Sequence, residues 1–242
     1  MKLYIENTRP INYVPKSVLI LVLVGFMAQS LWHAFFTKYN IRKTALSDPP
    51  RLEFVRAIAL GEEISAAKMI MLWLQAFDTQ PGISIPLKEL DYDRVIDWLD
   101  LILKLDSKTM YPLLAAIRFY AEVPLEEKQR RMIEYVTEKF LQAPNERWQI
   151  MAHAVYIAKH RIKDLKLAAE CARLLRLYAK GENVPYWAKQ MEFFVLEDMG
   201  ELEAAKILIG ALLESGELED PQQRKFLGQR LTEIEELQLS EK

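Results

Sequence analysis

The sequence of 242 residues has one cysteine and only eight glycines, and both shortages narrow the chemistry open to it. The single cysteine, Cys171, excludes a disulfide within the chain and cannot supply a thiolate zinc site by itself. Its surroundings, LAAECARLL, are typical of a buried helix face, so we expect an inert, buried thiol. Neither of the glycine patterns that cradle phosphates, G-x-x-x-x-G-K-[ST] and G-x-G-x-x-G, occurs.

Histidine is also scarce, with three residues in the whole chain. His153 and His160 share one helical face, but no HExxH or similar carboxylate spacing accompanies them, and a metal site needs at least three converging ligands. We expect His153 to be partly buried, His160 to lie on the surface, and His33 to be an interfacial side chain. The sequence therefore predicts no metal, no cofactor and no enzymatic activity.

The charge balance gives no support to nucleic acid binding. The whole chain carries a net charge of −2, and the first 40 residues contribute +3, so the remainder carries −5. A nucleic acid partner would require a basic patch to neutralise phosphates, and the overall balance runs the other way.

One long stretch, Ser17 to Thr37, contains no Lys, Arg, Asp or Glu and reads SVLILVLVGFMAQSLWHAFFT. A helix of this length reaches roughly 30 Å, which matches the hydrocarbon core of a bilayer. The aromatic residues Trp32, Phe35 and Phe36 lie at one end of the stretch and Tyr13 lies beyond the other. Aromatic side chains of this kind favour the headgroup zones of a bilayer. The apolar run is longer than the roughly 7 to 15 residues of a signal peptide, and no A-x-A cleavage pattern follows it. We therefore expect a retained transmembrane helix in a chain that starts at Met1.

The orientation of this helix is nearly balanced, because three basic residues precede it and three follow it: Lys2, Arg9 and Lys16, then Lys38, Arg42 and Lys43. The preceding tail is short and basic, which disfavours its transfer across a membrane. We expect the tail in the cytoplasm and the large C-terminal domain outside it, in a bacterial-type inner membrane.

Proline and glycine divide the rest of the chain. The expected organisation is an N-terminal tail (1–16), the transmembrane helix (17–37), a linker (38–50) that ends in Ser47-Asp48-Pro49-Pro50, and a helical domain (51–239). Apolar residues in the domain recur at helical spacing, and the interruptions predict ten helices after the anchor. We expect Gly61, Gly181, Gly200 and Gly216 at helix ends, with Gly181 in a left-handed conformation. Only Ile83 to Ile85 suggests a strand, so the predicted fold is all-α.

Pairs of alanines mark a possible repeat within this domain. Ala66-Ala67, Ala168-Ala169 and Ala204-Ala205 each lie near the start of the second helix of a pair, with separations of 102, three times 34, and 36. The stretch Gly200-Glu201-Leu202-Glu203-Ala204-Ala205, preceded by Pro185, Tyr186 and Trp187, resembles the tetratricopeptide repeat, and Lys163-Asp164 stands where that family has a turn glycine. The resemblance implies an α-solenoid of about five helix hairpins, a fold whose members bind peptides or other subunits.

Candidate partner-binding residues follow from this resemblance and from charge. Aromatic side chains that the stack does not need are possible anchors, and a basic turn between two helices could meet an acidic partner. The candidates are Trp73, Trp98, Tyr111, Tyr120, Trp148, Tyr186 and Trp187, with Arg161, Lys163 and Lys166 from the basic cluster Lys159–Lys166.

An acidic cluster lies within Asp91–Asp100, where Asp93, Asp97 and Asp100 share one helical face. Binding of a divalent cation or acid–base catalysis is conceivable there, but a solvated acidic stripe at a helix start is the more common arrangement. The corresponding plain interpretation of the basic cluster is a charged surface between two helices.

Two functional hypotheses follow from the sequence. The first is a membrane-anchored interaction or assembly scaffold, an accessory subunit of a membrane complex whose partners are proteins and, through residues 17–37, the bilayer. The second is an all-helical enzyme whose active site has no recognisable motif. The absence of His, Cys and Gly constellations favours the first hypothesis.

The anchor gives a direct prediction. Because residues 17–37 are long and uncharged, extraction with alkaline carbonate should leave the full-length protein in the membrane pellet, and removal of residues 1–44 should release a soluble, strongly helical domain. Full-length protein that is freely soluble without detergent would contradict the prediction.

Overall fold

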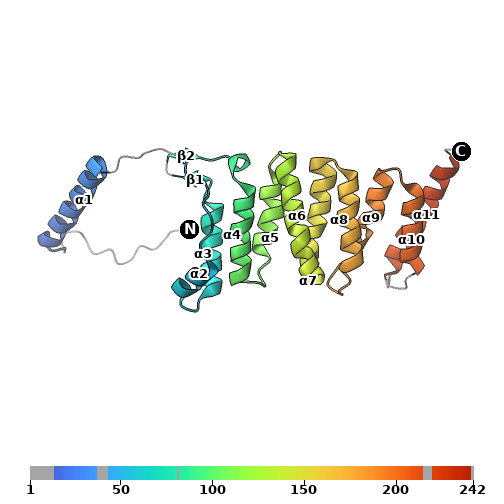
Figure 1. Ribbon diagram of the computed structural model, residues 1–242, viewed down its shortest axis with the longest axis horizontal. Helices are drawn as coiled ribbons and strands as arrows, with labels where there is room; N and C mark the ends of the chain where they lie inside the picture. The colour runs from blue at the N-terminus through green and yellow to red at the C-terminus, as the bar shows by residue number, and fades with distance from the viewer. Residues whose placement is uncertain (1–13, 37–42, 81, 215–219, 241–242) are drawn as a thin grey trace, which may run out of the picture. The chain divides into compact units, whose positions relative to one another are not determined.

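The computed structural model of the chain describes residues 14–36, 43–80, 82–214 and 220–240 (Figure 1). The chain divides into two compact units, one that contains the first helix and one that contains the remaining helices.

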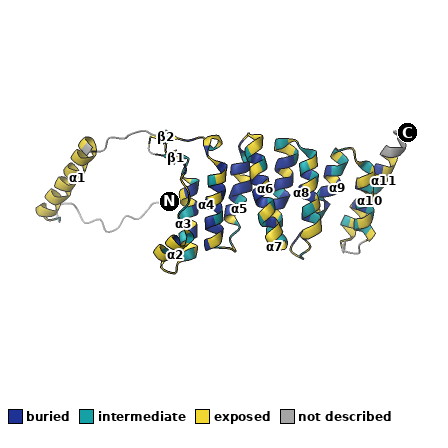
Figure 2. Ribbon diagram, in the orientation of Figure 1, coloured by how far each residue is buried: buried dark blue, intermediate teal, exposed yellow. Residues whose placement is uncertain are grey.

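The first unit contains α1 (Lys16–Phe36), whose 21 residues coincide with the predicted anchor to within one residue at each end. Its mean hydropathy reaches 1.9, and the side chains of residues 16–35 are exposed within the unit (Figure 2). An isolated helix with these side chains is long enough and apolar enough to span a membrane. Thr37, Lys38 and the tail up to Tyr13 lie outside the described residues.

The second unit is all-α, as predicted, and contains ten α-helices among its described residues. They are α2 (Leu52–Ala59), α3 (Glu63–Gln75), α4 (Tyr92–Leu105), α5 (Tyr111–Arg118), α6 (Glu126–Gln142), α7 (Pro144–Tyr156), α8 (Leu165–Tyr178), α9 (Tyr186–Asp198), α10 (Leu202–Glu214) and α11 (Pro221–Ser240). The predicted strand at Ile83 is β2 (Ile83–Ser84), which pairs with β1 (Thr79–Gln80).

Short helices of other types complete the unit. The 3-10 helix η2 (Leu87–Glu89) precedes α4, and the 3-10 helix η3 (Tyr120–Glu122) follows α5. The helix α7 passes directly into a π-helix, η4 (Ile157–Ile162).

Proline and aspartate residues lie at the starts of several helices. Pro112 lies in the first turn of α5 and Pro144 in the first turn of α7, where a missing N–H costs no intrahelical hydrogen bond. The Asp91 carboxylate caps α4 by accepting hydrogen bonds from the backbone N–H groups of Asp93 and Arg94, at 3.0 and 3.3 Å. These contacts satisfy donors that a helix start leaves unpaired.

Left-handed backbone conformations occur at three of the inter-helix turns. Gly61 has φ +95° and Gly200 has φ +75°, as expected of glycines at helix ends. Lys163 has φ +63° although it carries a side chain. Gly216 lies outside the described residues.

The prediction for Gly181 was wrong, because its φ is not positive. Its backbone N–H donates to Oδ1 of Asn145 at 2.7 Å, and a Cβ at this position would lie 3.0 Å from Cγ of Asn145 and 2.6 Å from Oδ1 of Asn183. Glycine is therefore needed here for close approach to the start of α7 rather than for a left-handed turn.

The helices of the second unit lie side by side in the order of the sequence (Figure 1). Each helix packs mainly against its immediate neighbours, as α8 does against α7 and α9. Further contacts join helices two places apart, namely α2 with α4, α4 with α6, α5 with α7, and α7 with α9.

Two hydrophobic clusters hold this unit together. The larger extends from Leu46 to Val195 and includes the fully buried side chains of Leu99, Tyr120 and Phe140. The smaller consists of Phe193, Ala205, Ile209, Leu227 and Ile234, which come from α9, α10 and α11. Because α9 contributes to both clusters, it joins the C-terminal helices to the rest of the unit (Figure 2).

The alanine pairs show the asymmetry expected from a helix. Ala67, Ala168 and Ala205 are buried, whereas their partners are less so: Ala66 and Ala169 are half-buried and Ala204 is exposed. Consecutive helical residues point about 100° apart, so only one member of each pair can face the core.

Replacement of Ala205 by Leu tests this packing. Three additional carbons in the small C-terminal cluster should cost about 1 to 3 kcal/mol of unfolding free energy, whereas Ala204→Leu, at an exposed position on the same helix, should change it by less than about 0.5 kcal/mol. Urea denaturation of the domain from Thr44 onward would measure both values.

Hydrogen exchange on Ala205→Leu would show which helices lose stability. Protection should fall first in α10 and α11, because these helices depend on the separate C-terminal cluster, while α2 and α3 keep theirs. A uniform loss of protection over residues 50–238 would instead indicate one cooperative bundle.

Candidate functional site

A groove of about 360 Å³ lies across α7, η4, α9 and α11. These elements are far apart in the sequence and are brought together by the packing of α9 against α7. The groove is lined by Val155, Tyr156, Lys159, His160, Met191, Phe194, Val195, Glu197, Asp198 and Arg230.

The π-helix shapes one wall of this groove. The backbone N–H of Asp164 donates to the carbonyl of Ala158 at 2.9 Å across a wide turn, and the chain leaves the turn through the left-handed Lys163. Turns of the π type are uncommon and occur frequently at functional sites.

Three rings follow one another along this wall. Tyr156 lies between His153 and His160, with ring centroids 5.6 and 4.9 Å apart. Burial, followed by the charge of Arg118, lowers the pKa of His153, which is half-buried as predicted; His160 is exposed, also as predicted. His153 is therefore neutral at pH 7 and acts as an uncharged ring in the stack.

Phe194 forms the opposite wall. Its ring centroid is 4.1 Å from that of the buried Phe193 and 6.3 Å from that of Phe226 on α11. Met191 and Val195 extend the apolar surface along α9. The two walls therefore present an aromatic and aliphatic floor to any molecule in the groove.

Ion pairs border this floor. The Lys159 ammonium pairs with Asp198, and the Arg230 guanidinium binds Glu197 through two parallel hydrogen bonds of 2.9 Å. The hydrogen bonds to Glu197 and Glu233 raise the pKa of Arg230 above its usual value. A rim that carries both signs of charge around an apolar floor is suited to binding a polypeptide segment with one or two apolar anchors.

Two of the aromatic residues singled out in the sequence meet near the starts of α7 and α9. Trp148 on α7 and Trp187 on α9 lie edge to face, with ring centroids 5.5 Å apart. Trp148 is half-buried and Trp187 is 52% exposed. Tyr186 is half-buried beside them, with the Lys189 ammonium 5.3 Å from the centre of its ring.

The other aromatic candidates serve the core or its edge. Trp98 is buried, donates from Nε1 to the Ser47 carbonyl at 2.9 Å and stacks on Trp73 at 4.6 Å. Tyr120 is completely buried, so no partner reaches it in the folded domain. Tyr111 is exposed, and its hydroxyl exchanges hydrogen bonds with the Gln75 amide at 2.8 and 3.1 Å.

The basic cluster is partly neutralised by its surroundings. Arg161 pairs with Glu122 at 2.5 Å, and Lys159 pairs with Asp198 at the groove. Lys163 and Lys166 are exposed. The cluster is therefore divided between helix contacts and solvent and does not form one continuous cationic patch.

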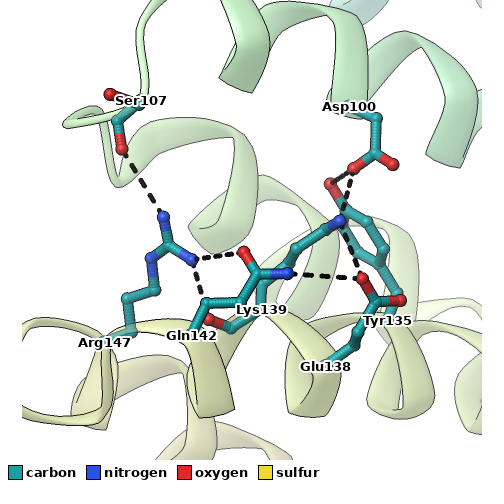
Figure 3. Close-up of polar contacts among 7 residues, drawn as sticks. All are labelled: Asp100, Ser107, Tyr135, Glu138, Lys139, Gln142 and Arg147. Atoms are coloured by element: carbon teal, nitrogen blue, oxygen red, sulfur yellow. Dashed lines mark hydrogen bonds and ion pairs between the residues drawn. The ribbon is translucent and has the colours of Figure 1, made fainter.

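The acidic cluster joins α4 to α6. Asp100 accepts a hydrogen bond from the Tyr135 hydroxyl and pairs with the Lys139 ammonium, both at 3.0 Å (Figure 3). Burial acts to lower the pKa of Lys139, but the hydrogen bonds to Asp100 and Glu138 outweigh it and raise that pKa. Asp93 pairs with Arg131 at 2.8 Å. In the described part of the chain, no group of three His, Cys, Asp or Glu residues is arranged to hold a metal ion.

The same network continues to α7 through Arg147 (Figure 3). Its guanidinium donates to the carbonyls of Lys139 and Ser107 at 2.7 and 3.5 Å and to the Gln142 side chain at 3.3 Å. Arg147 itself departs from helical geometry, with φ −107° and ψ 16°. The polar contacts therefore fix the junction of α4, α6 and α7.

Cys171 is buried on α8, as predicted, and burial raises the pKa of its thiol to about 12. A thiol with this pKa holds almost no thiolate at neutral pH, which makes it a poor nucleophile.

Sequence reasoning included Lys159 and His160 in its charged and histidine candidates but did not identify Tyr156 or Phe194. The spacing of Tyr156 and His160, four residues apart, indicates that they share a helical face. Phe194 reaches the same groove only through the packing of α7 against α9, which no local sequence pattern predicts.

Comparison with models of known protein families gives no match. Comparisons with curated proteins and with solved structures likewise give no match.

Asp164, at the turn next to the groove, gives a pH-dependent prediction. Its carboxylate caps α8 by accepting from the Leu167 N–H at 3.0 Å and binds Arg130 at 2.7 Å, and these contacts lower its pKa. Asp164→Ala should lose about 1 kcal/mol of unfolding free energy at pH 7, and Asp164→Asn, which keeps a capping oxygen, should lose less.

The contribution of the ionised carboxylate is complete above the unfolded-state pKa of roughly 4 and disappears as the pH falls through the lower folded-state pKa. Urea midpoints measured from pH 7 to pH 2 should therefore show wild type approaching Asp164→Asn on acidification. A difference that grows as the pH falls would contradict this assignment.

Proposed function

We propose that the protein is a membrane-anchored scaffold that holds or assembles partner proteins through its helical domain, as an accessory subunit of a membrane complex. In this proposal α1 spans the bilayer of a bacterial-type inner membrane, residues 1–16 remain in the cytoplasm, and the helical domain lies outside it. The length and hydropathy of α1 and the basic residues of the short tail support this arrangement.

We further propose that the helical domain is a solenoid related to tetratricopeptide repeats. The helices contact partners one or two places away in the sequence, as stacked hairpins do. In three hairpins a left-handed turn residue, Gly61, Lys163 or Gly200, is followed five or six residues later by a buried alanine. A reversal of the chain followed by a minimal side chain is what close packing of two antiparallel helices requires.

The groove is the observation that carries the binding function. It crosses α7 and α9, which in the proposed solenoid are the first helices of two successive pairs, and α11, which follows the second of these pairs. The resemblance to tetratricopeptide repeats implies that the concave, ligand-binding side is formed by these first helices. An aromatic floor with a rim of both charges fits a helical or extended segment of another protein that carries an apolar anchor.

Site-specific photocrosslinking tests this function in intact membranes. A benzophenone amino acid in place of Tyr156 or Phe194 should give discrete adducts with a partner protein, whereas the same group at Tyr178, exposed on α8 and outside the groove, should not. Phe194→Glu should weaken crosslinking from position 156 by about tenfold, since it places a charge on the apolar floor.

Two outcomes would contradict the proposal. Equal crosslinking from position 178 would place the partner elsewhere on the domain. Unchanged crosslinking from position 156 in the Phe194→Glu variant would show that the groove floor does not contribute to binding.

A further inference from the structure

The helices α2 and α3 expose an unusual amount of apolar surface. Seven large apolar side chains of these helices and their turn face solvent, and all except Trp73 are more than half exposed. We name this surface the α2–α3 patch; it consists of Phe54, Ile58, Leu60, Ile64, Met69, Leu72 and Trp73. Single exposed apolar residues are normal on proteins, but Phe54, Ile58, Met69 and Trp73 line one groove, and a clustered set of this kind marks a surface that something covers.

The composition of α3 strengthens this conclusion. Its sequence, EISAAKMIMLWLQ, is apolar around most of its circumference, yet within the domain it buries only Ala67, Met71 and Leu74 completely. A helix that is apolar all round is ordinarily buried on all sides, in a protein core or in lipid. One side of α3 therefore lacks the apolar surroundings that its sequence suits.

A groove of about 380 Å³ runs through the patch between α2, α3 and α4. Every residue that lines it is apolar: Pro50, Phe54, Val55, Ile58, Ala59, Ala66, Met69, Ile70, Trp73 and Trp98. One nearby pair of charges is neutralised, since Arg56 pairs with Glu63 at 3.2 Å across the two helices. Binding to this surface thus depends on apolar burial rather than on charge.

Leu60 shows that the exposure is built into the turn. It is 90% exposed and has φ +49°, a left-handed conformation that costs a residue with a side chain roughly 1 to 3 kcal/mol. Gly61 follows with φ +95°. The turn therefore has two consecutive left-handed residues, and the first of them is a leucine and not a glycine. The apolar side chain at the tip gains no burial within the domain to offset that cost.

The short linker between α1 and the helical domain indicates that a bilayer covers the patch. Seven residues separate Phe36, the end of α1, from Thr44, the start of the helical domain. Such a linker spans at most roughly 25 Å, so a membrane that holds α1 keeps the N-terminal end of the domain near its headgroups. Aromatic side chains such as Trp73 and Phe54 favour that zone, and residues 51–75 carry equal numbers of basic and acidic groups.

We infer that the α2–α3 patch inserts into the interfacial zone of the bilayer, so that the domain is held at the membrane by two elements. This inference rests on the proposed anchoring by α1. The inference goes beyond the anchoring by α1, because it assigns a lipid-binding surface to the helical domain itself.

Fluorescence quenching in proteoliposomes tests the inference on the full-length protein. Single cysteines at Ile58, Met69 and the control position Ile207, 70% exposed on α10, would carry an environment-sensitive probe in a Cys171→Ser background. In phosphatidylcholine vesicles with doxyl-labelled lipid, probes at 58 and 69 should be quenched and shifted to the blue, and the probe at 207 should be unaffected.

Flotation of the same vesicles distinguishes a failure of the patch assignment from a failure of the anchor. Protein that floats without quenching at 58 and 69 would overturn the patch assignment while leaving the anchor intact, and protein that does not float would overturn the anchor. Probes at 58 and 69 that are shielded from aqueous iodide but not quenched by doxyl lipid would show that a protein, such as a second copy, covers the patch.

A variant with the domain alone provides the second measurement. The fragment from Thr44 contains both hydrophobic clusters; it should stay soluble in buffer, as expected of the domain without its anchor, and cosediment with phosphatidylcholine vesicles when these are added. Ile58→Asp with Met69→Asp should weaken this binding by at least about tenfold, because burial of each large apolar side chain is worth about a decade or more in affinity. The matched control, Ile207→Asp, should bind as wild type, and equal binding by all three fragments would overturn the inference.

Discussion

The helical domain depends on close contact between the two helices of a pair. Such contact requires a sharp reversal of the chain and a minimal side chain soon after it, and both occur together at Gly61 and Ala67, at Lys163 and Ala168, and at Gly200 and Ala205. Each helix has an apolar face that its neighbours cover, and in the described part of the chain the main helix contacts join helices one or two places apart. The groove across α7, α9 and α11 is a consequence of this stacking, because helices two places apart meet on one side of it.

The helix count and most helix starts follow from the sequence because they depend on local chemistry. Pro112, Pro144 and the capping carboxylate of Asp91 act within one turn of their own positions, and the apolar periodicity between them is regular. Gly181 was misassigned for the opposite reason: its role is set by Asn145, which lies far away along the chain. Lys163 adopts a left-handed conformation that its residue type disfavours, so local preference could not predict it.

The candidate site was less predictable than the fold. The sequence indicated that Trp148, Trp187 and the basic turn were of interest, and the structure brings the two tryptophans into contact. The π-helix that positions Tyr156 and His160 has no established sequence pattern, and the opposing wall at Phe194 comes from another helix pair. Charged clusters were also difficult to interpret from sequence. Asp100 and Arg161 belong to stretches that read as solvated surfaces, yet Asp100 joins α4 to α6, and Arg161 contacts η3.

The bidentate contact between Arg230 and Glu197 has a consequence for the motions of the C-terminal end. The helix α11 packs chiefly on α10, and this contact is its polar link to α9, with a Glu197 side chain that is only 10% exposed. Because both residues also line the groove, a cationic group on a bound segment that competes for Glu197 would displace Arg230. Occupancy of the groove would then be coupled to fraying of α11, so the C-terminal helix would respond to what the groove binds.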